Sequence, residues 1–297
     1  MRSHRLAALA VALIALAGCT TPAEQRAQRS SASPTSPSAA STSRPAPVST
    51  SSSAASTSSP VPTTTRPVWV VGAKPLPLRP DGFGQILPTP PVLANRALPT
   101  TDILPPPRDD RYASTIAAVP PDVLARSTWQ PECPVAAADL RYLTMTFWGF
   151  DGRHHTGEMI VHKRVAEGVT QAFASLHAVR FPLEEMRVTT RPELDLHPTG
   201  DGNNTTAFVC RPAVNLKTWS AHASGLAIDV NPFCNPYIRG DLVLPELASS
   251  YVDRGWRRPG MLYAGDEAVR AFTAIGWSWG GNWTSPVDIQ HFTATGR

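Results

Sequence analysis

Residues 20 to about 66 consist almost entirely of Ser, Thr, Pro and Ala, and this segment limits most strongly what the chain can fold into. It has almost no large apolar side chains, so it cannot bury enough surface to offset the entropy lost on ordering. We therefore expect residues 19–66 to form a disordered tether. In an extended polyproline-like form, at about 3.1 Å per residue, the tether would reach on the order of 150 Å.

The N-terminus contains two arginines, Arg2 and Arg5, followed by an apolar run from Leu6 to Leu16. This run is shorter than the roughly 20 residues of a membrane-spanning helix, so residues 1–18 are interpreted as a signal peptide. The sequence Leu-Ala-Gly-Cys that ends at Cys19 resembles the bacterial lipobox, in which the cysteine is lipidated and becomes the mature N-terminus. We expect an exported lipoprotein, held on the outer face of the cell membrane by this lipid alone. The alternative is a plain secretory signal followed by an incidental cysteine.

The rest of the chain divides into two parts. Residues 67–115 remain rich in proline but include large apolar side chains such as Trp69 and Phe83, so they form either an ordered strap or further linker. Residues 116–297 suffice for one compact domain, which we expect to be monomeric. The net charge of +4 is too weak and too scattered to indicate nucleic-acid binding.

Three cysteines fall in this folded part, Cys133, Cys210 and Cys234. In an oxidising compartment a disulfide is plausible, and an odd count leaves one thiol over. The sequence alone leaves three pairings open.

Periodic patterns predict the main secondary structure. Apolar residues alternate in 140–150 and again in 155–162, which predicts a hairpin. Helical spacing predicts a helix over 163–178 and a second over 267–275, with Asp266 as its N-cap. Because strands and helices do not alternate regularly, we expect an α+β domain with a small antiparallel sheet and a few helices.

The first motif that indicates chemistry is SAHASGLAIDVN, residues 220–231. Leu226 to Val230 has the pattern of a strand whose even-numbered residues face the core, so Asp229 points to the opposite face. His222 precedes a turn at Gly225 and can fold back toward Asp229. The simpler alternative is a capped turn with an exposed aspartate and an unrelated histidine.

The second motif, WSWGGNWTSPVDIQHF at 277–292, adds His291 and Asp288. Two histidines and one carboxylate are the three protein ligands that catalytic zinc uses, with a fourth position left for water. Zinc lowers the pKa of that water toward about 7, and Asp288 is the candidate base that takes its proton. The chain must bend for Asp288 and His291 to face one site, and Pro286 makes such a bend credible.

Together the two motifs resemble the zinc D-alanyl-D-alanine carboxypeptidases and L-alanyl-D-glutamate peptidases, which include the VanY-type enzymes and several phage endolysins. The family motif is Ser-x-His-x₆-Asp, followed far downstream by an acid, two residues and His. Its positions fall on Ser220, His222, Asp229, Asp288 and His291. The resemblance covers about 130–297 and implies a hedgehog-like or DD-peptidase-like fold around a zinc cleft, with His222, Asp229 and His291 as zinc ligands and Asp288 as base.

The resemblance also implies roles for residues outside the metal site. Arg211 would contact the substrate or the developing oxyanion; the less favoured alternative is a surface arginine beside a disulfide loop. Ser220 would either bind substrate or brace its loop. Independently of the resemblance, the glycine-rich loop before the base carries Trp279 and Trp283, which either wall the cleft or pack in the core. Among the disulfide pairings, the resemblance favours Cys133 with Cys210.

The expected function is zinc-dependent hydrolysis of a stem-peptide bond of peptidoglycan, either L-Ala–D-Glu or D-Ala–D-Ala. Asp288 followed by a His291-Phe292 pair favours the endopeptidase branch. A non-haem iron oxygenase fits poorly, because its first two ligands are normally spaced as His-x-Asp. A non-catalytic wall-binding lipoprotein is the other alternative: Asn282, where relatives often have Asp, and the unpaired cysteine favour it, whereas Asp288 argues against it.

Overall fold

The computed structural model describes residues 69–214 and 216–296. The predicted signal peptide, Cys19 and the tether at 19–66 therefore lie outside the described residues. Within the described part of the chain, no helix is long and apolar enough to cross a membrane. The α-helices are α1 (Pro121–Arg126), α2 (Ala166–Ala178) and α3 (Glu267–Ala274). The strands are β1 (Ser114–Ala118), β2 (Leu140–Gly149), β3 (His154–His162), β4 (Pro182–Leu183), β5 (Glu185–Met186), β6 (Asn204–Thr205), β7 (Ala227–Asp229), β8 (Tyr237–Arg239), β9 (Leu242–Leu244), β10 (Ser278–Trp279), β11 (Val287–Asp288) and β12 (His291–Thr293). Short 3₁₀ helices are η1 (Ala137–Asp139), η2 (Lys163–Val165), η3 (Arg191–Asp195), η4 (Ala221–Ser224), η5 (Ser249–Tyr251) and η6 (Gly280–Asn282).

The two longest strands, β2 and β3, form the predicted hairpin. They pair antiparallel from Leu140 opposite His162 to Trp148 opposite His154, which confirms this prediction. The exposed strand β1 extends the sheet on the free edge of β2, and it begins at Ser114, inside the proline-rich segment 67–115. Strand β4 also pairs with β2, in parallel, so this sheet has four strands.

The remaining strands form three smaller sheets, in the orders β10-β12-β7, β11-β8-β9 and β5-β6. The α+β class with few helices and small antiparallel sheets is therefore confirmed. The structure differs from the prediction in having four sheets, with parallel pairing in β2–β4 and β5–β6. The reason is that strands of two or three residues are too short to show a period in the sequence.

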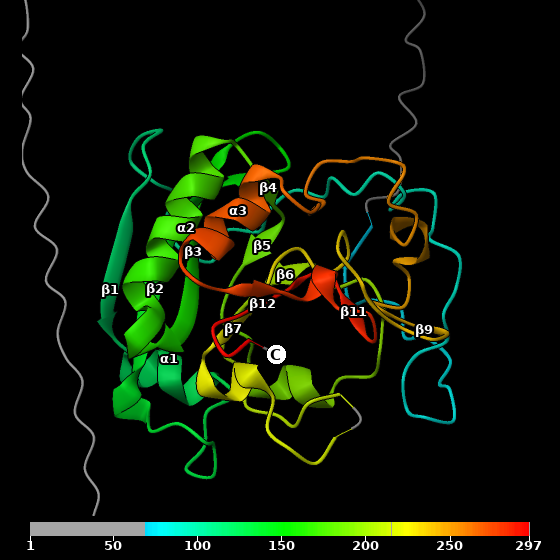
Figure 1. Ribbon diagram of the computed structural model, residues 1–297, viewed down its shortest axis with the longest axis horizontal. Helices are drawn as coiled ribbons and strands as arrows, with labels where there is room; N and C mark the ends of the chain where they lie inside the picture. Colours follow the sequence, from blue (N-terminus) through cyan, green and yellow to red (C-terminus); the bar gives the residue numbers. More distant parts are fainter. Residues whose placement is uncertain (1–68, 215, 297) are drawn as a thin grey trace, which may run out of the picture. The chain divides into compact units, whose positions relative to one another are not determined.

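Helices α2 and α3 lie side by side and share one hydrophobic core with β2, β3, β7 and β12 (Figure 1). Val169, Phe173 and Leu176 are buried on α2, at the helical spacing that predicts this face. The ring of Phe272 on α3 lies edge-to-face against Phe173, with centroids 5.9 Å apart. On its other side Phe272 stacks on Phe292 of β12 at 4.1 Å. The core of the helices thus also holds β12 in place.

Residues 69–113, which we call the N-terminal strap, lie along the domain without a regular helix or strand. Leu93 of the strap is fully buried, in a hydrophobic cluster that includes Tyr251. Arg96 forms a buried ion pair with Glu184, with 2.6 Å between Nε and Oε2. Contacts with residues distant in the sequence, several of them buried, therefore order the strap, although its sequence has no periodic pattern.

Cys133 and Cys210 form a disulfide, as the family resemblance implies, with their Cα atoms 6.0 Å apart. The bond links two segments separated by 77 residues in the sequence. Cys234 is buried as a free thiol. Burial raises the pKa of Cys234 to about 12, so the thiol stays protonated at neutral pH.

Candidate metal centre and active site

His222 is held by η4, a single 3₁₀ turn that its own neighbours cap. The Ser220 hydroxyl accepts a hydrogen bond from the backbone N–H of His222 at 3.3 Å. Gly225 ends the turn with a φ of +66°, in the left-handed region. A Cβ added to Gly225 would lie 2.6 Å from the backbone nitrogen of His162, so this position requires glycine. Ser220 therefore braces the loop, one of the two roles considered for it.

A backbone contact selects the nitrogen with which His222 can bind a metal. Its Nδ1 lies 2.6 Å from the carbonyl oxygen of Ala207. A carbonyl can only accept, so Nδ1 donates, and in the neutral ring that would bind a metal Nε2 carries the lone pair. A hydrogen bond of this kind is the usual support of a metal-binding histidine.

Asp229 and His291 are brought together by strand pairing. Strands β7 and β12 are antiparallel, with Asp229 directly opposite His291 and Ile228 opposite Phe292. Ile228 and Phe292 are both fully buried, so alternation along each strand turns Asp229 and His291 to the other face. The strand predicted over 226–230 is thus present as β7, one residue shorter at each end.

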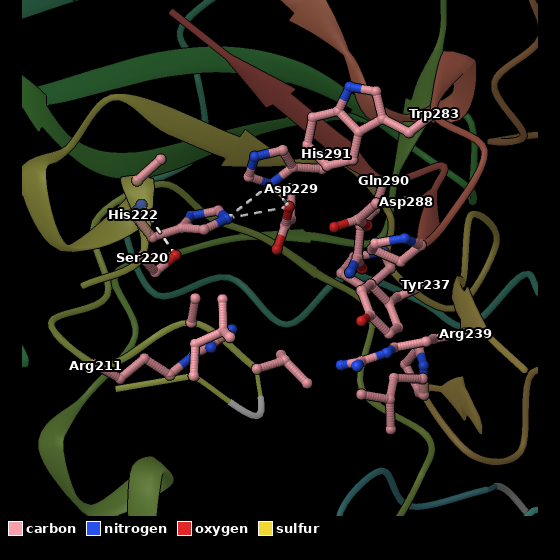
Figure 2. Close-up of a pocket in the computed structure, with 18 of the residues that line it drawn as sticks. Arg211, Ser220, His222, Asp229, Tyr237, Arg239, Trp283, Asp288, Gln290 and His291 are labelled. Atoms are coloured by element: carbon pink, nitrogen blue, oxygen red, sulfur yellow. Dashed lines mark hydrogen bonds and ion pairs between the residues drawn. The ribbon is translucent and has the colours of Figure 1, made fainter. Parts of the chain in front are cut away.

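Three atoms from these side chains form a nearly equilateral triangle (Figure 2). His222 Nε2 lies 3.1 Å from His291 Nδ1 and 3.2 Å from Asp229 Oδ1, and the third side, between Asp229 Oδ1 and His291 Nδ1, is 3.0 Å. In a tetrahedral zinc site with bonds of about 2.0–2.1 Å, ligand atoms lie roughly 3.3 Å apart. The spacing and the chemistry of these donors therefore fit a zinc ion with three protein ligands.

The electrostatics of Asp229 also suit a metal ligand. Burial raises the pKa of this carboxyl, but the charges of His222 and His291 and hydrogen bonds from both rings outweigh that effect. Their sum holds the pKa of Asp229 well below its usual range, so the carboxylate is ionised at any pH at which the protein would work. An ionised carboxylate is the form that binds a metal.

Asp288 lies on β11, which pairs with β8. The backbone of Gly280 approaches it so closely that an added Cβ would lie 2.5 Å from the Asp288 carbonyl oxygen. Its Oδ1 is buried and has no hydrogen-bond partner among the described residues. Burial, together with the negative charge of Asp229, raises the pKa of Asp288 to about 7. A carboxyl poised near neutral pH can both take and return a proton.

The chain bends between Asp288 and His291, as the sequence requires for one shared site, and the two residues belong to different sheets. Both line a single cavity of about 960 Å³, together with Arg211, Ser220, His222, Asp229 and Trp283. The structure thus brings all the predicted active-site residues together. Trp279, by contrast, is buried in the core, where its Nε1 donates to the carbonyl oxygen of Ile289 at 2.7 Å.

The same cavity contains residues that the sequence analysis missed, among them Tyr237, Arg239 and Gln290. Gln290 lies between the predicted base and the predicted ligand, so its position in the motif was a usable signal. Tyr237 and Arg239 belong to a three-residue strand, which is too short to reveal which of its side chains share a face.

Comparison with known families supports this site. Residues 214–294 match the model of a family described as D-alanyl-D-alanine carboxypeptidase. The matched stretch includes all three candidate zinc ligands and Asp288, while Arg211 lies just before it. The match confirms the resemblance to this peptidase family over these residues and supports a peptidase. No curated protein and no solved structure gives a significant match.

Proposed function

We propose that this protein is a zinc-dependent peptidase that hydrolyses a stem-peptide bond of peptidoglycan. The observation that carries the proposal is the triangle of His222 Nε2, Asp229 Oδ1 and His291 Nδ1, with sides of 3.0–3.2 Å, beside the carboxyl of Asp288, whose buried Oδ1 has no partner among the described residues. The family match over 214–294 supports the same activity. In this proposal the domain has the DD-peptidase-like fold, with the cavity as its zinc cleft.

His222, Asp229 and His291 would hold the zinc ion. When bound, zinc supplies a Lewis acid that polarises the scissile carbonyl and lowers the pKa of water toward about 7. Asp288 lies beside the ligands, and its buried Oδ1 is an acceptor without a protein partner. Asp288 would therefore take the proton of the attacking water and deliver it to the leaving amine.

Arg211 lines the same cavity, and its positive charge lowers the pKa of Asp288. A guanidinium at this position can bind a substrate carboxylate or the developing oxyanion. Trp283 lies over the ligand side of the cavity, with its ring centroid 5.4 Å from that of His291. The indole would shield one side of the metal centre from solvent and contact the substrate.

The L-Ala–D-Glu bond is our first choice of substrate, because Asp288 followed by a His291-Phe292 pair resembles the endopeptidase branch of the family. The D-Ala–D-Ala bond is the second candidate, because the matching family is described as a carboxypeptidase. Exported and held by lipid on Cys19, the enzyme would work in the cell wall. A wall-binding protein that retains the fold without catalysis remains the alternative.

The test is to incubate the purified, zinc-loaded protein with defined muropeptides, with and without a chelator, and to identify the products by mass spectrometry. Release of a peptide that begins at D-Glu would establish the endopeptidase, and loss of a terminal D-Ala the carboxypeptidase. In both cases the chelator should abolish the reaction. If the folded, zinc-loaded protein cleaves neither substrate, the wall-binding alternative replaces the proposal.

A further inference from the structure

Arg239 lies on the wall of the cavity that also carries the predicted base. Strand β8 pairs with β11 so that Tyr237 is directly opposite Asp288. Arg239 follows two residues later, so its side chain emerges on the same face of β8 as that of Tyr237. Arg239 and Asp288 are thus diagonal neighbours across the two strands, and such neighbours have Cα atoms about 7–8 Å apart. Figure 2 shows Arg239 beside Tyr237, on the opposite side of the pocket from Arg211.

The guanidinium of Arg239 is not used by the fold. Among the described residues, it has no ion pair and no side-chain hydrogen bond, and the residue is exposed. The two glutamates that line the cavity are already engaged: Glu193 pairs with Arg187 at 2.9 Å, and Glu246 accepts from the backbone of Gly84 at 2.8 Å. Arg239 is therefore a cation that faces the cavity and is free to bind an anion.

The substrates of the proposed function carry an anion at a fixed place. In the L-Ala–D-Glu bond, the leaving amine belongs to D-Glu, whose α-carboxylate is one carbon away because the stem continues through the side-chain carboxyl. In the D-Ala–D-Ala bond, the leaving amine belongs to the terminal D-Ala, whose carboxylate is likewise one carbon away. Both substrates thus present a carboxylate next to the nitrogen that Asp288 would protonate.

We propose that Arg239 binds the α-carboxylate of the residue whose amine leaves, and so determines specificity for a free carboxylate at this position. This inference rests on the proposed peptidase function. With the amine at Asp288, the attached carboxylate lies within reach of a side chain that emerges from the neighbouring strand. Arginine suits this role because its planar guanidinium makes two parallel hydrogen bonds to a carboxylate. Arg211, on the other side of the cavity, is left for the carbonyl side of the scissile bond.

The experiment compares two stem peptides that differ only in the group on the leaving residue, a carboxylate in one and a carboxamide in the other. The peptides are based on whichever bond the zinc-loaded full-length protein cleaves. A charged hydrogen bond is lost with the amide, so kcat/KM should be roughly ten- to a hundredfold lower for it, mainly through KM. Arg239→Gln should lower kcat/KM for the carboxylate peptide by a similar factor and leave the amide peptide nearly unchanged. Arg239→Lys keeps the positive charge but not the two parallel N–H donors of the guanidinium. It should retain part of the preference for the carboxylate peptide.

Arg164→Gln is the matched control. Arg164 is exposed and does not line the cavity, and its substitution removes the same charge as Arg239→Gln. It should leave the preference intact, and zinc content should be the same in all variants. If Arg239→Gln lowers kcat/KM equally for both peptides, or if the wild-type protein shows no preference for the carboxylate peptide, the inference is wrong while the peptidase function stands. If the wild-type protein cleaves neither stem-peptide bond, the proposed function and this inference are both wrong.

Discussion

Asp229 and His291 occupy directly opposite positions on two antiparallel strands, and 3.0 Å separates Asp229 Oδ1 from His291 Nδ1. The register of β7 and β12 therefore sets the distance between two candidate ligands. A slip of one residue would turn His291 into the core and Phe292 into the cavity. The stacking of Phe292 on Phe272 opposes such a slip, so core packing also fixes the geometry of the candidate metal centre.

Substitution of a candidate zinc ligand and substitution of the candidate base should have different effects on zinc content. We expect His291→Ala to lose zinc, because two remaining ligands cannot hold the ion, and to lose activity with it. Asp288→Ala should keep zinc, yet its turnover should fall by about 10²–10⁴, the usual contribution of a general base. Zinc content per chain and turnover of the muropeptide that the wild-type protein cleaves are the two measurements. Full activity in Asp288→Ala would show that the base is a different residue.

Asp288 also predicts how the stability of the metal-free protein depends on pH. Its pKa is raised from 3.8 to about 7, so between these values the folded state holds a proton that the unfolded state has released. The stabilising effect is complete below about pH 4 and is lost as the pH rises through 7. The free energy of unfolding should therefore fall in this window, by up to about 1.4 kcal/mol per pH unit from this one group.

The control for this pH dependence is Asp288→Asn, which has no proton to release at this position. Urea unfolding of both chelator-treated proteins at several pH values between 4 and 8 isolates the effect, since other titrating groups are common to both. The difference in stability, Asp288→Asn minus wild type, should grow as the pH rises. A difference that does not change with pH would contradict the raised pKa of Asp288.

The main elements could be predicted because their patterns are long. Alternation over 140–162 and helical spacing over 163–178 each repeat several times, and the structure confirms the hairpin and the helix, which begins with a 3₁₀ turn. The Asp266 cap was also predictable, and its side chain accepts from the backbone N–H of Val269 at 2.8 Å. Strand β1 was not predictable, because all five of its residues are exposed and it is placed by pairing with β2, a contact that its own sequence does not encode.

The candidate site was predictable in its residue types but not in its walls. His222, Asp229, Asp288 and His291 fall in two short motifs that match a known family pattern, and their residue types are those that zinc chemistry requires. By contrast, Arg239 reaches the cavity through the pairing of β8 with β11, a contact between segments about 50 residues apart that no local pattern encodes. For a similar reason the sequence does not predict whether the N-terminal strap is ordered, since contacts with residues distant in the sequence order it.

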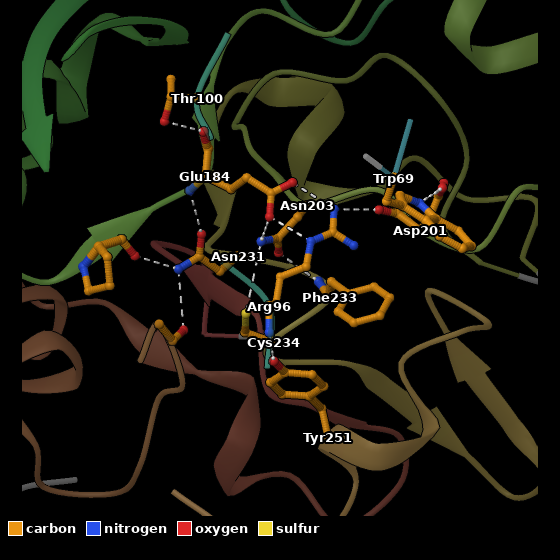
Figure 3. A network of polar contacts seen from close by, with 12 residues as sticks. Trp69, Arg96, Thr100, Glu184, Asp201, Asn203, Asn231, Phe233, Cys234 and Tyr251 are labelled. Atoms are coloured by element: carbon orange, nitrogen blue, oxygen red, sulfur yellow. Dashed lines mark hydrogen bonds and ion pairs between the residues drawn. The ribbon is translucent and has the colours of Figure 1, made fainter. Parts of the chain in front are cut away.

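The strap should contribute strongly to stability through Arg96. Its guanidinium makes two hydrogen bonds to Glu184 at 2.6 Å, a third to the carbonyl oxygen of Asp201 at 2.7 Å, and lies over the ring of Phe233 (Figure 3). Breaking a buried ion pair by removing one partner costs about 3–5 kcal/mol, because the other charge stays buried. We expect Arg96→Met to lower the free energy of unfolding by this amount. The measurement is urea denaturation monitored by tryptophan fluorescence.

Arg111→Met provides the comparison, because Arg111 pairs with Asp109 at 2.7 Å on the surface, where its side chain is 88% exposed. Removing that pair should change stability by less than about 1 kcal/mol. Equal effects of the two substitutions would mean that the buried Arg96–Glu184 pair stabilises the fold no more than a surface pair does.

The thiol of Cys234 should be unreactive in the folded protein. It is fully buried and its pKa is about 12, so almost no thiolate exists at pH 8. In a chain carrying Cys19→Ala, we expect no reaction with a thiol reagent under native conditions and one reactive thiol after unfolding in urea without reductant. Three reactive thiols after unfolding would show that the Cys133–Cys210 disulfide is not formed.

The strap has a mechanical consequence as well. Its first described residue, Trp69, donates through Nε1 to Asp201 at 2.8 Å, and Arg96 grips Glu184 farther along. A pulling force on the chain before Trp69 would act first on these contacts. It would have to break them and detach the strap from the rest of the domain before it reached β7 or β12. The strap would therefore protect the candidate metal centre mechanically. Tension applied at the N-terminal side would detach the strap before it changed the distances among His222, Asp229 and His291.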